Sequence, residues 1–321
     1  MGSLFALMAA LGFSLSNVMI KKGTTKASKN NGAFVSILIT ALLSGIIFIF
    51  VGLSNGFPNL NTKGVIWFII AGVLTTFLGR TLLYNSIQYL GSVKATAIKR
   101  LNPFFAVILG VLLLNEPFTL TLFIGMSLIF SSFGILIYDN YKASNSNLSK
   151  KETAASLDAG NSTVVNKGWR RFNLKKLISL SYMYGILSAV CYAFGYVARK
   201  IGLAEIPEPF FGAMLGAGVG AILFVITALF RERYRVSVIT TFTKFEIFLI
   251  LAGLFSSLGQ ICYFLALSKI EVSRVALIAS TEVIFTILLS MVLLRKVEKH
   301  SRVVIFAALL GMAGAMVLAV G

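Results

Sequence analysis

The chain repeats segments of about 20 mostly apolar residues, and this pattern limits the folds open to it more than any other feature. Such a segment is long enough to cross the hydrocarbon core of a bilayer as a helix. A helix also satisfies its own backbone hydrogen bonds where water is absent. We therefore predict an all-α integral membrane protein with ten transmembrane helices. The ten predicted spans lie at residues 3–20, 32–53, 64–87, 93–114, 118–138, 180–198, 210–230, 245–267, 272–294 and 302–320.

The composition agrees with a lipid environment. Hydrophobic residues make up 57% of the chain and charged residues only 12%. A soluble domain carries about 25% charge to cover its core. The formal net charge is +18, which in a soluble chain would point to nucleic acid as a partner. In a membrane protein, the position of the basic residues decides what this excess means.

The basic residues are concentrated in alternate loops. Of the 29 Lys and Arg residues, 21 fall in one set of loops or at the span ends beside them, five in or beside the opposite set, and three well within predicted spans. Cytoplasmic loops of membrane proteins carry such an excess. We therefore predict a protein of the cell membrane whose long polar segment 139–179 is cytoplasmic and whose two termini are outside. The excess charge then indicates contact with anionic membrane lipids and no nucleic acid partner.

The two halves of the chain repeat one another. Arg80 and Gln260 are 180 residues apart, each directly after a glycine, and the same offset relates Asn102 to Glu282. Because each repeat has an odd number of spans, the two copies are inverted relative to one another in the membrane. Inverted repeats are characteristic of secondary transporters, whose substrate binds between the halves near the midplane, although duplicated channels also occur. The predicted parts are a first five-helix repeat at 1–138, a polar basic linker at 139–179 and a second five-helix repeat at 180–321.

The fourth predicted span and its end carry a motif, which reads Leu101-Asn102-Pro103-Phe104-Phe105-Ala106 and then Leu114-Asn115-Glu116. This motif resembles the fourth-helix signature of EamA-type proteins, the ten-helix members of the drug/metabolite transporter superfamily. The signature often has Glu where this chain has Asn102, and Gly where it has Asn115. The resemblance covers essentially the whole chain. It includes the first-helix stretch Gly12-Phe13-Ser14-Leu15-Ser16-Asn17.

The second copy of the motif departs further from the family pattern. It keeps the acid as Glu282 but lacks the proline, and Arg295-Lys296 stands where the pattern has Gly-Glu. The resemblance implies export or exchange of polar or amphipathic metabolites such as amino acids, without defining the substrate. It also implies two cytoplasmic termini; we keep the opposite orientation, which the loop charges predict. The last helix of each half tends to be peripheral in related proteins, which is compatible with a homodimer.

Glu282 is the strongest candidate for a functional residue. It lies about 10–15 Å into the ninth predicted span and therefore near the bilayer midplane. Ionisable groups at such a depth are costly and usually serve a binding site, a proton relay or an ion pair. We predict a site for a substrate amine or a proton. The alternatives are a structural partner for Lys99 or Arg100, or a misplaced span.

Three basic residues within spans, Arg80, Lys99 and Arg100, are further candidates. Their long stems would let them snorkel to cytoplasmic headgroups. Alternatively, they form a basic vestibule that attracts a carboxylate or a phosphate. Lys99 and Arg100 are about 100° apart on a helix, so both cannot face one narrow cavity equally well. Polar and aromatic side chains at similar depth complete the predicted site, although each alone more often forms an interhelical hydrogen bond. They are Asn17, Tyr84, Asn102, Gln260 and Tyr263.

Enzyme activity, a cofactor and a metal site are not expected. The chain has one histidine, His300, and two cysteines, and it lacks the glycine loop with Lys and Ser/Thr that binds nucleotide phosphates. Gly212, Gly216 and Gly220, spaced four apart within a span, indicate close helix packing. We predict a secondary active transporter of a small polar or amphipathic metabolite, with proton coupling as an option. The alternatives are a flippase or auxiliary subunit for a phosphorylated lipid carrier, and a non-transporting membrane scaffold.

Overall fold

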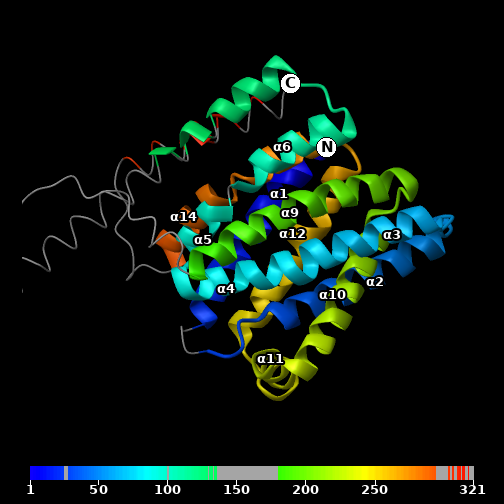
Figure 1. Ribbon diagram of the computed structural model, residues 1–321, viewed down its shortest axis with the longest axis vertical. Helices are drawn as coiled ribbons and strands as arrows, with labels where there is room; N and C mark the ends of the chain where they lie inside the picture. The colour runs from blue at the N-terminus through cyan, green and yellow to red at the C-terminus, as the bar shows by residue number, and fades with distance from the viewer. Residues whose placement is uncertain are drawn as a thin grey trace, which may run out of the picture.

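The computed structural model is a bundle of helices, of which the longest run side by side (Figure 1). The structure describes residues 1–24, 28–99, 101–128, 130–132, 134–135 and 180–293, together with separate positions between 303 and 317. Every regular element within these residues is a helix, so the all-α prediction is confirmed for this part of the chain. The linker at 139–179, Arg100 and most of the tenth predicted span lie outside the described residues.

Seven of the described helices are long and apolar enough to cross a membrane. Two shorter apolar helices, Leu101–Leu114 and Leu120–Ser132, fall on further predicted spans. The chain is thus a multi-pass membrane protein. The first half contains α1 (Gly2–Gly23), α2 (Ala33–Asn55), a continuous third helix of α3 (Thr62–Ala71), η1 (Gly72–Gly79) and α4 (Arg80–Leu90), and then α5 (Ser92–Lys99) and α6 (Leu101–Leu114). The second half contains α9 (Leu180–Glu205), α10 (Pro209–Phe230), α11 (Glu232–Thr243), α12 (Ile247–Leu267), α13 (Val272–Ala279) and α14 (Glu282–Leu293).

Two segments differ from the prediction. The sixth predicted span ends at residue 198, but α9 continues to Glu205, so the predicted loop at Arg199 and Lys200 is wrong. Arg199 is hydrogen-bonded inside the bundle, and its charge therefore does not end the helix. The predicted loop at 231–244 contains the helix α11, which lies at one end of α10 (Figure 1). Glu232 in its first turn suits the positive end of the helix dipole.

Contacts between loops bring three of the basic loops to the same end of the bundle. Lys29 forms an ion pair with Glu232 at 2.7 Å, and its hydrogen bond holds the pKa of that carboxyl below the ordinary value. Arg233 donates a hydrogen bond to Gln88 at the end of α4. The alternation of loop charges predicted that these loops share one side. We call this end the basic end; it comprises residues 28–31, 88–91 and 231–237.

The two halves interlock through equivalent helix pairs. The first helix of one half, α1, packs against α12, α13 and α14 of the other half. The corresponding helix of the second half, α9, packs against the third helix and against α5 and α6 of the first half. The second helices repeat the pattern, because α2 packs against α12 and α10 packs against α3 and η1. The interface between the halves therefore forms the core of the bundle.

Glycines let one of these pairs approach closely. Gly216 of α10 lies with its backbone against Gly72 of η1, and a Cβ added to Gly72 would be 2.6 Å from the Gly216 carbonyl oxygen. Gly212 lies against the ring of Phe68 of α3. The close helix packing indicated by the glycine spacing is therefore confirmed, and it lies within the bundle.

The outer surface of the bundle is apolar. Large hydrophobic side chains on α2, α6 and α10 are more than half exposed, as expected where lipid takes the place of water. They include Leu42, Ile46, Phe50, Leu112, Ile222 and Leu229.

Glu116 connects the halves at the end of the bundle opposite the basic end. Its carboxylate accepts hydrogen bonds from the backbone N–H groups of Val272 at 2.7 Å and Ser273 at 3.1 Å. It thereby caps α13, whose own N-cap residue, Glu271, makes no side-chain cap bond. The preceding residue, Asn115, has φ 52°, a left-handed conformation that Asn and Gly adopt more readily than most residues. This explains why the EamA-type pattern often has Gly at that position.

We expect Glu116→Gln to lower the free energy of unfolding by about 1–2 kcal/mol, because an amide has only one acceptor oxygen for the two backbone donors. Chemical unfolding of the purified chain in detergent measures this loss. Glu246→Gln is the matched control, because Glu246 precedes α12 without capping it through its side chain. Equal losses in the two variants would contradict the capping role of Glu116.

Candidate functional site

The centre of the interface between the halves contains a buried ion pair. Lys99 Nζ lies 3.1 Å from Glu282 Oε2 and 3.4 Å from Oε1, and Asn17 Nδ2 donates to Oε1 at 2.6 Å. The side chains of Lys99 and Glu282 are only 9% and 5% exposed. Each charge therefore stabilises the other where little water is present. Because α5 supplies Lys99 and α14 supplies Glu282, the pair joins the two halves.

An interruption in the ninth predicted span positions Glu282. Helix α13 ends at Ala279 and α14 begins at Glu282, with Ser280 and Thr281 forming a turn between them. The hydroxyl groups of these two residues donate to backbone carbonyls of the preceding turn, which replaces part of the interrupted hydrogen bonding. Ser14 of α1 donates to the main-chain carbonyl of Glu282 at 2.6 Å. Irregular backbone at membrane depth is tolerated where protein encloses it in this way.

A small cavity lies beside the ion pair. Its volume is about 20 Å³, which is room for about one water molecule. The amide oxygen of Asn102 is buried and has no hydrogen-bond donor, and Asn102 lines the cavity. The cavity wall therefore offers an acceptor that a bound molecule can satisfy. Residues of both halves line it, among them Lys99, Asn102, Tyr196, Tyr263, Ser280 and Glu282.

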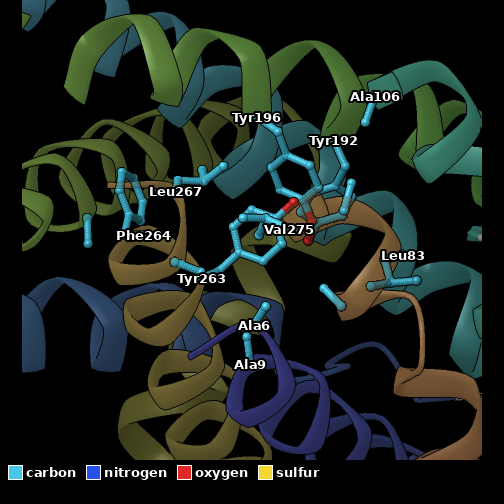
Figure 2. Packing of buried hydrophobic residues seen from close by; sticks show 14 of the residues in the cluster. Ala6, Ala9, Leu83, Ala106, Tyr192, Tyr196, Tyr263, Phe264, Leu267 and Val275 are labelled. Carbon is cyan, nitrogen blue, oxygen red and sulfur yellow. The ribbon is translucent and has the colours of Figure 1, made fainter. Parts of the chain in front are cut away.

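Aromatic rings enclose the same region. Tyr196 and Tyr263 stack with their ring centres 4.2 Å apart, and Tyr192 lies 5.6 Å from Tyr196. Figure 2 shows these three rings in the buried core, with their hydroxyl groups turned towards one another. Lys99 Nζ lies 5.0 Å from the ring centres of both Tyr192 and Phe13, which is within the range of a cation–π interaction. The surroundings of the ion pair thus accommodate an ammonium group.

Arg80 is buried and does not snorkel to the membrane surface. Its side chain is 1% exposed, and its Nη1 donates to the Ser36 carbonyl at 3.0 Å and to Thr40 Oγ1 at 2.9 Å. Tyr84, one turn further along α4, donates to Ser36 Oγ at 3.0 Å. The snorkelling alternative is therefore wrong for Arg80. The physical reason is that oxygen atoms of α2 offer the guanidinium hydrogen bonds inside the bundle, which lipid tails cannot.

Arg199 is a central residue that the sequence reasoning missed. It is 1% exposed, and Thr75 of η1 accepts a hydrogen bond from its guanidinium. Gln260 accepts from it too, in the amide orientation that satisfies both groups. A usable signal was present in the spacing, because Tyr192, Tyr196 and Arg199 follow an i, i+4, i+7 pattern along one face of a helix. The signal appears only when the predicted sixth span is extended beyond residue 198.

The predicted site residues fall into two groups. Those around the ion pair and its cavity are Asn17, Lys99, Asn102, Tyr263 and Glu282. Those around the two buried arginines are Arg80, Tyr84 and Gln260, while Arg100 lies outside the described residues. Among the residues that the structure describes, no group of three or more His, Cys, Asp or Glu side chains could hold a metal ion.

Comparison with known families gives a match over both halves of the chain. The EamA-like transporter family matches residues 1–138 and 179–320. The chain belongs to the EamA-like transporter family. It is therefore a membrane transporter of the drug/metabolite transporter superfamily, and the resemblance carried by the motif in its fourth span is confirmed. The family match leaves out the polar segment between the two predicted repeats.

A solved structure shares the fold of this EamA-like chain. It is a crystal structure of a protein that superposes with a TM-score of 0.61 and covers 99% of this chain and 98% of that chain. The two sequences are 14% identical, so the likeness concerns the fold alone. The comparison with curated proteins gave no match. The substrate therefore has to be argued from the site itself.

Proposed function

We propose that the chain is a secondary active transporter that moves a small polar or amphipathic metabolite by alternating access of two inverted five-helix halves. The observation that carries this proposal is the buried Lys99–Glu282 pair, which joins the halves beside a small cavity. A solute that engages Glu282 competes with Lys99 for the same carboxylate. Loss of the pair then frees the two halves to move relative to one another.

The packing of the helices supports the inverted arrangement. The first helix of each half packs against the third and fourth helices of the other half, as a two-fold relation between inverted units requires. The proposal counts ten spans, of which the tenth is a prediction from the sequence at 302–320. The basic end contains three of the loops with the excess of Lys and Arg residues. On this proposal it faces the cytoplasm of the cell, and both termini are outside.

The geometry of the site favours a soluble solute over a lipid. The cavity has room for about one water molecule and lies among side chains of both halves, whereas a phosphorylated lipid requires a long groove for its acyl chains. Asn102 Oδ1 is a buried acceptor that no protein group satisfies, and it faces the cavity, which fits a site that takes up a polar molecule better than a packed scaffold. Both observations favour solute transport.

The test is uptake of a panel of metabolites into proteoliposomes, with and without a pH gradient. We expect Glu282→Gln to reduce uptake by about tenfold or more, because a hydrogen bond to a charged group contributes about 1.5–3 kcal/mol. The variant should also lose any response to the pH gradient. Glu205→Gln, at an exposed acid near the far end of α9, is the matched control. Full uptake with an unchanged pH response in Glu282→Gln would show that this carboxylate has no part in transport.

A further inference from the structure

Two arginines in the centre of the bundle have no acidic partner among the residues that the structure describes. Arg80 and Arg199 are among the largest fully buried side chains. Within the described residues, no carboxylate forms an ion pair with either guanidinium. The buried acids of this part of the chain are engaged elsewhere, Glu282 with Lys99 and Glu116 with the first turn of α13. The described interior therefore holds more positive than negative charge.

In the described part of the chain, neutral groups hold the two guanidinium groups in place. Arg80 donates to a backbone carbonyl and to hydroxyl oxygens of α2. Arg199 donates to Thr75 and Gln260 and lies 4.6 Å from the ring centre of Phe264, while its Nε is buried without an acceptor. Such dipoles orient a guanidinium but do not neutralise it. In a medium of low dielectric constant, the uncompensated charges favour a negatively charged partner.

The third helix brings the two arginines together. The segment η1 has the i→i+5 hydrogen bonding of a π-helix and ends directly before Arg80. In an α-helix Thr75 and Arg80 would point about 140° apart, whereas the wider π turn brings residues five apart towards the same face. Thr75 accepts a hydrogen bond from Arg199, and Ser188 of α9 donates to the carbonyl of Gly79, directly before Arg80, at 2.7 Å. The two arginines therefore belong to segments of α9 and the third helix that are in direct contact. Segments of π-helix occur frequently at functional sites.

We propose that Arg80 and Arg199 together bind an anionic group of the transported solute, either a carboxylate or a phosphate. The planar guanidinium fork donates parallel hydrogen bonds to such oxygens, and Arg199 Nε is a donor still without an acceptor. Lys99 is engaged by Glu282, so the anion binds at the arginines and not at the ion pair. The inference rests on the proposed transport function and names the substrate class, namely solutes with at least one negative charge.

The site is closed in this structure. Both arginines are almost completely enclosed, so an anion reaches them only when α9 and the third helix separate, as alternating access requires. Until then, the neutral partners keep each guanidinium oriented, which lowers the cost of ordering it when the anion arrives.

The experiment measures thermal unfolding of the purified full chain in detergent, with sodium phosphate, sodium succinate or dihexanoyl phosphatidate, each against sodium chloride at equal ionic strength. We expect phosphate or succinate to raise the unfolding midpoint of the wild type by on the order of 5 °C at saturation. Arg199→Gln should lose this shift. Arg235→Gln, at an exposed arginine of α11, should keep it. In chloride alone, Arg199→Gln should unfold at the wild-type temperature or above, because it removes the repulsion between two buried cations.

Several outcomes would overturn the inference. The first is that neither phosphate nor succinate raises the unfolding midpoint of the wild type. The second is that the rise in midpoint persists in Arg199→Gln. The third is that Arg199→Gln has an unfolding midpoint lowered equally in every salt, as a purely structural role of Arg199 predicts. A shift with phosphatidate alone would assign the site to a lipid phosphate and contradict a soluble solute. If Arg199→Gln does not fold, Arg199→Lys replaces it, which keeps the charge but loses the fork and should lose most of the shift.

Uptake into proteoliposomes separates this inference from the transport function itself. Uptake restricted to neutral or cationic solutes would contradict the anion site and leave the transport function standing. Stabilisation by anions without uptake of any solute would contradict the transport function and leave the anion site standing.

Discussion

Lys99→Met is expected to lower the free energy of unfolding by about 3–5 kcal/mol, because it leaves the Glu282 carboxylate buried without its counter-charge. That side chain is 5% exposed, and Lys99 Nζ lies 3.1 Å from its Oε2. Asn17 donates one hydrogen bond to the same carboxylate but brings no charge. Unfolding of the purified chain in detergent by urea or SDS measures the loss.

A double variant separates the loss of the pair from the loss of one side chain. Lys99→Met combined with Glu282→Gln is expected to recover most of the stability, because two neutral groups carry a smaller desolvation penalty than a single buried charge. Lys63→Met, at an exposed lysine near the start of α3, should change the stability by less than about 0.5 kcal/mol. A Lys99→Met chain as stable as the Lys63→Met chain would disprove the energetic role of the pair.

Gly72→Ala is expected to destabilise the chain at or above the upper end of the range of about 1–3 kcal/mol for an overpacked core. The new Cβ would lie 2.6 Å from the carbonyl oxygen of Gly216 and 2.7 Å from its Cα. Both atoms belong to the backbone of α10, so no side chain can rotate away. Relief requires that η1 and α10 move apart, which weakens the contact between the halves. The midpoint of chemical unfolding in detergent reports this effect.

The matched control lies on the partner helix. A Cβ added to Gly218 of α10 meets no atom within 4 Å. Gly218→Ala should therefore stabilise the helix by about 0.5–1 kcal/mol, because alanine loses less backbone entropy than glycine on folding. The two glycine variants differ in the sign of their expected effect. Equal tolerance of both would mean that the close approach of the two helices does not constrain Gly72.

Much of the architecture follows from local sequence. The clean apolar runs at 32–53 and 210–230 fall on α2 and α10 to within about two residues, because apolar length and the absence of charge are properties of the segment itself. The end of the sixth span is not predictable in the same way, because it depends on residues of other helices. The charge of Arg199 predicts the start of a loop, yet Thr75 and Gln260 accept hydrogen bonds from Arg199 within the bundle.

The candidate site was only partly predictable. The depth of Glu282 marks it as costly and therefore of interest, and Lys99 follows from the same argument. The sequence offers Lys99 or Arg100 as a partner for Glu282 and does not choose between them, and the structure pairs Glu282 with Lys99. The role of Glu116 was equally hidden, because the backbone donors that it caps belong to a helix 156 residues further along the chain.

The amino-acid sequence by itself determined a helical membrane protein of two related halves, with one acid and several bases at membrane depth. These are local or periodic properties, readable from hydropathy, charge and a constant offset. Only the tertiary structure decided that Lys99, 183 residues from Glu282, is its partner. It also decided that the segments with Arg80 and Arg199 are in contact, with no carboxylate of the described residues in an ion pair with either arginine. The physical reason is that a buried charge is satisfied by whichever group packing brings within a few ångströms, and packing joins residues that the chain itself keeps far apart.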